Sequence, residues 1–233
     1  MTTLFWRALM LWSLILPATE AKQLWTDPSF SLLRGENYQL GDSDRTIVTF
    51  EHASGHDWGD TFLFIDRLES SNGFTETYGE FTLRYGIKEW PEQFIKKLSL
   101  AGSTEVGDGF TNYLYGFGLD LDIPGFRYFQ ANFYLRNNEF AERTEQLTLV
   151  FAIPLGPLLW DGFIDFAGSG KNDLGQPFTA SPNFTSQLKY DLGPSLGLSS
   201  RLYAGVEYVY WQDKFGVQGI DERNVNLLLK WHF

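Results

Sequence analysis

Residues 224–233 read "NVNLLLKWHF", and their side chains alternate between two classes. One set is wholly apolar: Val225, Leu227, Leu229, Trp231 and Phe233. The other set is polar except at one position: Asn224, Asn226, Leu228, Lys230 and His232. Successive side chains of a β-strand point to opposite faces, so this stretch predicts a strand with one apolar face and one polar face. Leu228 is the exception on the polar face.

The same alternation recurs along the chain. Clear examples are "RYFQANFYLR" (127–136), "EQLTLVFAIPL" (145–155) and "RLYAGVEYVYW" (201–211). These stretches have the length of a tilted membrane strand, about 9–11 residues, whereas soluble strands mostly run to about 5–6. With weaker candidates added, the pattern predicts about twelve strands, the even number usual in bacterial barrels. They cover residues 29–40, 45–53, 58–68, 74–85, 96–105, 111–122, 126–137, 145–155, 160–167, 183–192, 199–211 and 222–233.

The distribution of charge separates two all-β architectures. In a secreted β-sandwich, the outward face of each strand is solvated and often charged. Here one face of several strands is continuously apolar and aromatic, and the opposite face carries too many charged residues for a protein core. Only helices and closed barrels satisfy their backbone polar groups in lipid. We therefore predict a single-domain transmembrane antiparallel β-barrel with a polar interior.

The first 21 residues, "MTTLFWRALMLWSLILPATEA", have another character. One positive charge at Arg7 precedes an apolar run from Ala8 to Leu16, and Pro17 and small residues follow. This order is typical of a secretory signal peptide, and we place the cut after Ala21. The alternative is a membrane anchor, which needs about 20 apolar residues, roughly twice the run present. The prediction is a leader over residues 1–21 and a barrel over residues 22–233.

Charge and connections narrow the class further. The formal net charge of -11 argues against a nucleic-acid polymer as partner, because phosphate binding requires a basic face. The absence of cysteine excludes disulfides and thiolate metal sites. Most long polar connections fall on one side of the predicted barrel and most short turns on the other, as in outer-membrane barrels. Residues 86–95 are an exception: a long link on the short-turn side, where we expect a turn of helix near Pro91.

The inward faces predict a lined passage. Barrels of about eight strands are filled by side chains and those of about sixteen or more leave a wide channel, so an intermediate barrel should hold a narrow one. Aromatic rings beside hydrogen-bonding groups suit a solute with a flat face and a polar edge. Strand parity selects the candidate solute-binding residues: Phe62, Phe64, Asp66, Glu80, Arg84, Tyr128, Tyr134, Arg136 and Glu207.

Other chemistry finds little support. A barrel phospholipase needs a Ser–His pair with an orienting partner, and no third residue accompanies His52 and Ser54. "GSGK" (168–171) lacks the Gly at 165 and the Ser or Thr at 172 that a phosphate loop requires. Nothing completes a metal cage around Asp120 and Asp122. We predict no enzymatic activity, no cofactor and no metal.

Several stretches carry a family resemblance: "TFEHASGHDWGDTFLFID" (49–66), "YGEF" (78–81), "GFGLDLDIPGFRYFQANFY" (116–134), "DGFIDFAGS" (161–169) and "VEYVYWQDKFGVQGIDE" (206–222). The chain resembles the Tsx-like nucleoside-specific channel family of the Gram-negative outer membrane. The resemblance implies a monomeric twelve-stranded barrel that passes nucleosides, with outer loops that serve some relatives as phage receptors. Phe62, Phe64 and Asp66 fall in the first stretch. Its "EHASG" form departs from the sequence of the best-studied nucleoside channel at this place, which leaves the substrate open.

The sequence therefore predicts a passive channel of the Gram-negative cell outer membrane for nucleosides or similar small solutes. The alternative is a structural or surface-recognition barrel with a blocked lumen, whose loops bind a phage or colicin. The chain's last residue, Phe233, resembles the terminal aromatic that the barrel-assembly machinery reads. The expected partners are small polar solutes, outer-membrane lipid and that machinery.

Overall fold

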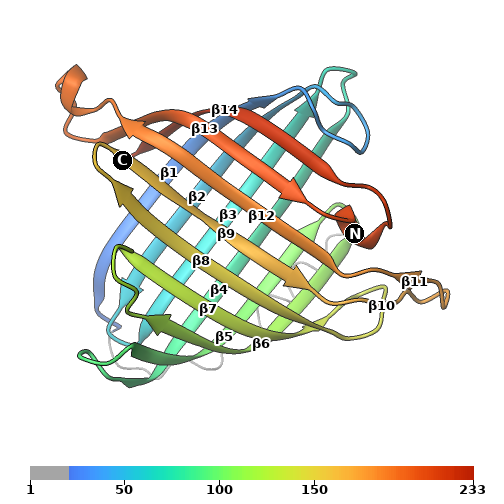
Figure 1. The fold of residues 1–233 in the computed structure, drawn as a ribbon, viewed down its shortest axis with the longest axis horizontal. Coiled ribbons are helices and arrows are strands. Elements are labelled where there is room, and N and C mark those ends of the chain that lie inside the picture. Colours follow the sequence, from blue (N-terminus) through green and yellow to red (C-terminus); the bar gives the residue numbers. More distant parts are fainter. Residues whose placement is uncertain (1–20) are drawn as a thin grey trace.

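The computed structural model describes residues 21–233, which form one closed antiparallel β-barrel of twelve strands (Figure 1). The fold class predicted from alternation is thus confirmed. The leader predicted over residues 1–21 lies, except for Ala21, outside the described residues. In the described part of the chain, no helix is both long and apolar enough to cross a bilayer.

The barrel strands follow one another around the wall in chain order. They are β1 (Gln23–Gly35), β2 (Arg45–His56), β3 (Gly59–Ser70), β4 (Thr75–Glu89), β5 (Ile95–Gly107), β6 (Phe110–Leu121), β7 (Tyr128–Asn137), β8 (Thr144–Leu155), β9 (Leu158–Ala167), β12 (Ser181–Asp191), β13 (Arg201–Trp211) and β14 (Glu222–His232). The short strands β10 (Gly170–Lys171) and β11 (Pro177–Phe178) pair with each other outside the barrel. Two short 3-10 helices lie in connections: η1 (Pro194–Leu196) and η2 (Lys214–Gly216).

Two predicted segments differ from the structure. The first strand, predicted over residues 29–40, runs from Gln23 to Gly35. It ends early because residues 36–44 form a loop whose Tyr38 is buried. The helical turn expected near Pro91 is wrong. Strand β4 instead continues to Glu89, and the connection 90–94 follows without a helix. A hydrogen bond of 2.7 Å from the backbone N–H of Trp90 to the carbonyl of Lys96 closes it.

The last strand is paired on both edges. β14 pairs with β13 on one side and with β1 on the other, where Ser31 lies opposite Lys230 and Leu33 opposite Leu228. The ring of Phe233 stacks on that of Phe30 with 5.8 Å between centroids. The alternating stretch that ends the chain is therefore the strand that closes the barrel.

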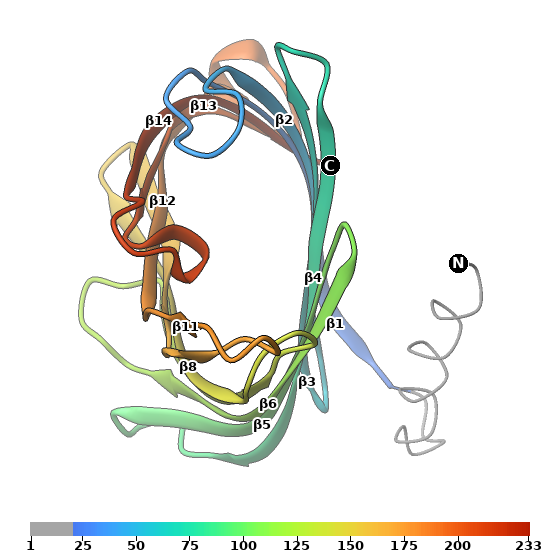
Figure 2. The same cartoon turned by 90° about the vertical axis from the view of Figure 1, so that its right-hand side faces the viewer.

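The two ends of the barrel differ. The loop end carries the connections 36–44, 71–74, 108–109, 138–143, 168–180 and 212–221. The opposite end, here called the turn end, carries 57–58, 90–94, 122–127, 156–157 and 192–200, and Phe233 lies there (Figure 1). Long connections gather at the loop end, as the sequence predicted. Figure 2 looks into that end and shows loops 36–44 and 212–221 curving inward over the mouth.

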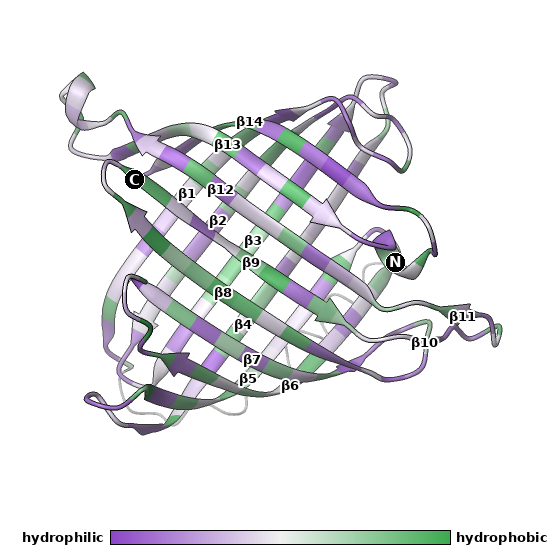
Figure 3. Cartoon of the chain, viewed as in Figure 1, coloured by the Kyte–Doolittle hydropathy of each residue, from purple (hydrophilic) through white to green (hydrophobic). Residues whose placement is uncertain are grey.

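The faces of the wall are inverted relative to a soluble protein. On β14, Leu227 is 68% exposed on the outer face, whereas Asn224 and Asn226 on the inner face are buried. Figure 3 shows the matching alternation of hydrophilic and hydrophobic positions along the strands. An apolar exterior around a polar interior is the arrangement of a transmembrane barrel.

Candidate functional site: the lumen

Strand register decides which side chains share the lumen, because directly paired residues point to the same face. Glu51 pairs with Phe64, Phe64 with Glu80, and Glu80 with Glu105. Continuing this register around the barrel places every predicted solute-binding residue on the inner face. They come from four strands: Phe62, Phe64 and Asp66 from β3, Glu80 and Arg84 from β4, Tyr128, Tyr134 and Arg136 from β7, and Glu207 from β13.

Four rings form a continuous track on one side of the lumen, here called the aromatic ladder. The ring centroids of Phe62 and Phe64 are 6.1 Å apart, those of Phe64 and Tyr78 are 5.7 Å apart, and those of Tyr78 and Phe110 are 6.3 Å apart. Phe62 faces inward and is still 39% exposed, so solvent reaches its ring from the lumen. A solute in the lumen meets the ladder as an apolar strip in a polar wall.

Four inner carboxylates are held by neutral donors. Tyr78 donates its phenol proton to Oε1 of Glu80 at 2.6 Å, and Gln187 donates to Oε2 of Glu207 at 2.9 Å. Threonine hydroxyls donate to the others, Thr49 to Asp66 at 2.6 Å and Thr148 to Asp165 at 2.5 Å. Among the described residues, these four carboxylates have no ion-pair partner: Asp66, Glu80, Asp165 and Glu207.

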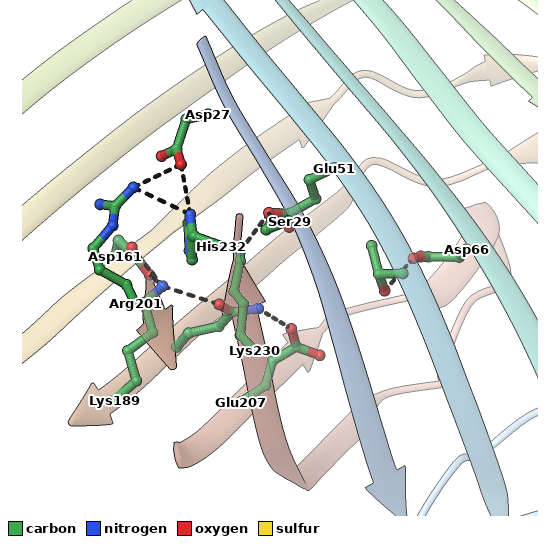
Figure 4. Close-up of polar contacts among 12 residues, drawn as sticks. Asp27, Ser29, Glu51, Asp66, Asp161, Lys189, Arg201, Glu207, Lys230 and His232 are labelled. Carbon is green, nitrogen blue, oxygen red and sulfur yellow. Dashed lines mark hydrogen bonds and ion pairs between the residues drawn. The ribbon is translucent and has the colours of Figure 1, made fainter. Parts of the chain in front are cut away.

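Most cations of the wall, by contrast, are matched by a carboxylate, as Lys230 and Lys189 are in Figure 4. Arg45 is the exception among the described inner-face cations, because it donates to the backbone carbonyl of Asp42 at 2.9 Å. The pairs are Lys230 with Glu51, Lys189 with Asp161 at 2.6 Å, Arg136 with Glu105, Lys97 with Asp60 at 3.5 Å, and Arg84 with Asp120 and Asp60. Paired cations leave the four neutral-held carboxylates uncompensated. The lumen wall therefore carries a surplus of acidic groups.

Exposure divides the predicted site residues into two groups. Arg84 is 2% exposed, and Tyr134 and Glu207 are also buried, so these three build the wall. Phe62 and Tyr128 are well exposed to the lumen, and Arg136 is partly exposed. Strand parity gives the face of a residue but not its reach into the lumen.

The structure brings only part of the predicted set together. Glu80 and Arg136 lie beside the aromatic ladder, linked through Glu105, which pairs with Glu80 in the sheet and with Arg136 by charge. Tyr128 stands apart near the turn end. The sequence prediction omitted Phe110, although its position two residues before Asn112 marks it as inward-facing.

The remaining candidate chemistry does not assemble in the described residues. His52 shares a hydrogen bond of 2.8 Å with Thr26, and Ser54 contacts His56 and Thr61 instead of His52. The described residues contain no group of three or more His, Cys, Asp or Glu placed to hold a metal ion.

No family model and no curated protein sequence matches the chain. Solved structures do match. The NanC porin superposes with a TM-score of 0.57 at 10% identity, and the KdgM porin with a TM-score of 0.54 at 8% identity. Each comparison covers 89% of this chain and 99% of the porin. The same coverage holds for a KdgM porin in complex with disordered oligogalacturonate, with a TM-score of 0.53 at 10% identity.

Such low identities establish the fold, while the Tsx-like resemblance stays a prediction. The chain thus has the twelve-stranded barrel fold of solved porins.

Proposed function

We propose that the protein is a passive channel, rather than an enzyme, for nucleosides or similar small solutes with a flat ring. The aromatic ladder carries this proposal. Its centroid spacings of 5.7–6.3 Å allow a solute to leave one ring as it meets the next. Stacking of a base on an aromatic side chain contributes about 1–3 kcal/mol and tolerates any base. Conduction requires binding that is favourable and also weak or shared between sites, which a ladder of similar rings supplies.

The polar groups beside the ladder suit the hydrogen-bonding edge of a nucleoside. Glu80 accepts hydrogen bonds, and Arg136 donates them from the neighbouring wall. Ribose hydroxyls both donate and accept, so either group can orient a sugar while its base lies on a ring. Tyr128 belongs to the same proposal as a second contact nearer the turn end.

The surplus of lumen carboxylates bears on the class of solute. One porin of the same fold is described in complex with oligogalacturonate, which is a polyanion. The cations that could bind such a ligand are already engaged by wall carboxylates, as in the Lys230–Glu51, Lys189–Asp161 and Arg136–Glu105 pairs. Neutral solutes such as nucleosides need no free cation in the wall.

The cellular setting follows from the same features. We propose that the chain is exported with a leader cleaved near Ala21 and lies as a monomer in the outer membrane of a Gram-negative bacterium. The apolar outer face, for example Leu227 and Trp231, would contact lipid. Phe233 would be read by the barrel-assembly machinery, and the connections of the loop end would face outside.

Single-channel recording with purified protein tests the proposal. Adenosine or thymidine should reduce the current through the wild-type channel, and Phe62→Leu or Phe64→Leu should weaken this block. Phe133→Leu is the matched control, because Phe133 lies on the outer face of β7. A conducting protein that no nucleoside blocks would contradict nucleoside specificity. Block that survives both lumen substitutions would remove the ladder from the site.

One observation favours a second candidate function, surface recognition. Loop 36–44 places Tyr38 inside the mouth of the barrel, where it is buried. This arrangement also suits a surface-recognition barrel with a closed lumen, whose loops bind a phage or colicin. The two candidates differ in conductance, since only the channel passes ions and neutral solutes in liposomes.

A further inference from the structure

Loop 36–44 is docked against the inside of the barrel wall. Tyr38 is 7% exposed and packs in a cluster with Leu33, Ile47 and Leu228. Register places these three aliphatic residues on the inner faces of β1, β2 and β14. The cluster explains why Leu228 interrupts the polar face of the last strand: it is part of a binding surface for the Tyr38 ring. The guanidinium carbon of Arg45 lies over the ring, 4.9 Å from its centroid.

Hydrogen bonds fix the loop to β14. Tyr38 donates its hydroxyl proton to Oδ1 of Asn226 at 2.9 Å, and the side-chain amide of Asn37 donates to the carbonyl of Arg223 at 2.7 Å. On the other side of the loop, Oδ2 of Asp42 accepts from the hydroxyl of Ser71 at 2.7 Å and from the backbone N–H of Asn72 at 2.8 Å. The loop is therefore held at both of its sides.

Loop 212–221 is tied to the same point of β14. Its Lys214 donates to Oε1 of Glu222 at 2.7 Å, while the backbone N–H of Gln39 in loop 36–44 donates to Oε2 of Glu222 at 3.1 Å. The Glu222 side chain is almost completely buried, at 1% exposed. One carboxylate thus joins the two loops that curve over the mouth in Figure 2.

The backbone of loop 212–221 supports a fixed conformation. Asp213 and Phe215 both have positive φ, at 45° and 58°, which non-glycine residues adopt only where the surroundings enforce it. The N–H of Gly219 donates to the Asp213 carboxylate at 2.6 Å, and Lys214 lies 4.8 Å from the ring centroid of Trp211. These contacts hold Lys214 in reach of Glu222.

We propose that loop 36–44, docked through Tyr38 and coupled to loop 212–221 by Glu222, is the size filter of the lumen at its loop end. Tyr38 and Glu222 act as positioning residues: they hold the two loops in place and do not contact the solute. The held loops then limit the size of the solutes that pass. The inference rests on the proposed channel function. It adds a determinant that is separate from the aromatic ladder.

Solute size cut-off and conductance test the filter. Proteoliposome swelling in a series of neutral sugars of increasing size gives the cut-off, and single-channel recording gives the conductance. Tyr38→Ala should raise both, because the loop loses its anchor. Phe140→Ala is the control, since Phe140 is 56% exposed on another loop-end connection, 138–143, and its substitution should leave both unchanged. A wild-type cut-off and conductance in Tyr38→Ala would overturn the filter.

Two further variants keep the test valid if Tyr38→Ala assembles poorly. Tyr38→Phe and Glu222→Gln preserve side-chain volume and remove, respectively, the bond to Asn226 and the charge that holds Lys214. Each should give more frequent transitions to a higher conductance. Their absence in both variants counts against the filter.

A cross-link provides the reverse experiment. The described chain has no cysteine, so Asn37→Cys with Arg223→Cys introduces a unique pair. Bridging this pair with a short dithiol-reactive reagent in the Tyr38→Ala background should restore the wild-type cut-off, and release of the bridge should raise it again. A cut-off that does not respond to the bridge would overturn the filter.

Failure of the filter and failure of the channel are distinguishable. If the wild type conducts nothing while Tyr38→Ala conducts, docking of loop 36–44 is upheld and the transport proposal fails. If both conduct with one cut-off, transport is upheld and the filter fails. If neither conducts, both proposals fail.

Discussion

Gly118 leaves the space that Arg84 occupies. A β-carbon added at Gly118 would lie 3.0 Å from Nε of Arg84 and 2.3 Å from Oδ1 of Asn132. Because β6 has no side chain at this point, the guanidinium of Arg84 lies against the wall, where it pairs with Asp120 and Asp60. Gly118 and the two carboxylates thus keep the guanidinium of Arg84 out of the passage.

Gly118→Ala should therefore push Arg84 toward the lumen and lower the single-channel conductance. The position has no positive φ, so the added methyl group causes crowding rather than backbone strain. Overpacking of this kind typically costs about 1–3 kcal/mol, which a barrel can tolerate. Ser99→Ala is the control: Ser99 lies directly opposite Gly118 on β5, and its hydroxyl has no hydrogen-bond partner in the structure. Equal conductance in the two variants would refute this role of Gly118.

The Glu51–Lys230 pair bridges β2 and β14 across β1 (Figure 4). Lys230→Met should lower the temperature at which the folded band shifts on a gel, because it leaves the Glu51 carboxylate without its partner in a largely buried position. Removing one member of a buried pair typically costs about 3–5 kcal/mol. The double variant Glu51→Gln with Lys230→Met should recover most of the loss. If Lys230→Met were as heat-resistant as the wild type, closure of the barrel between β1 and β14 would not depend on this pair.

The surplus of lumen carboxylates predicts cation selectivity. In a salt gradient at a mildly alkaline pH, chosen so that these carboxyl groups are ionised, the reversal potential should show preference for the cation. Asp66→Asn and Asp165→Asn should each reduce that preference. A charge about 4 Å from a passing ion contributes about 1 kcal/mol in water, which is about a fivefold change in relative permeability. Glu145→Gln is the control because Glu145 is exposed and paired with the outward-facing Leu135. Anion preference in the wild type would contradict the charge assignment.

Alkaline pH should loosen loop 36–44. Burial raises the pKa of the Tyr38 phenol, and the nearby Glu207 and Glu222 raise it further, against the opposing effects of Asn226 and Arg45. The docked loop therefore keeps the proton that an undocked Tyr38 loses near its ordinary pKa of about 10. Docking is fully supported below that pH and weakens as the pH rises above it.

Conductance measured through this alkaline range should rise in the wild type, and Tyr38→Phe should remove the part of the rise that Tyr38 causes. Ultraviolet absorbance of tyrosinate, compared between the two proteins, reports the titration itself. If the wild type and Tyr38→Phe gave identical pH profiles of conductance, ionisation of Tyr38 would not control docking of the loop.

Deletion of Phe233 should impair assembly before it affects conductance. Its ring packs on Phe30 and, with 4.9 Å between centroids, on Trp231 at the turn end. The fraction of heat-shifting barrel in the membrane measures assembly. Phe74→Ala is a control of similar exposure on a loop-end connection. Normal amounts of folded barrel without Phe233 would contradict the proposed recognition of the terminal aromatic.

Strand parity predicted the barrel because membrane and lumen impose opposite demands on alternate residues of every strand. The same local pattern could not identify where β1 ends. Tyr38 leaves the strand to pack on Leu228, a residue at the far end of the sequence, and no pattern near Tyr38 records that contact. For the same reason, the sequence of β14 alone does not explain why the apolar Leu228 lies on its polar face.

The sequence also could not predict how far each inward-facing side chain is exposed to the lumen. Parity placed Arg84 and Phe62 on the same inner wall, yet Arg84 is buried and Phe62 is open. The difference arises from Gly118, which lies two strands away from Arg84 and makes room for its side chain. No glycine of the described residues makes such room for Phe62. Charge pairing across strands, as between Glu51 and Lys230, is also a property of register rather than of spacing along the chain.

The contact between β1 and β14 has a kinetic consequence. Leu33 lies opposite Leu228, so the barrel closes through residues that are almost as distant in the sequence as the described chain allows. Loop-closure entropy opposes such contacts, and chains dominated by them fold slowly. Until β14 arrives, the free edge of β1 presents unpaired backbone groups that other chains can capture. Closure at this seam should be the last step of folding, and the interval before it is when the unfinished barrel is most exposed to aggregation.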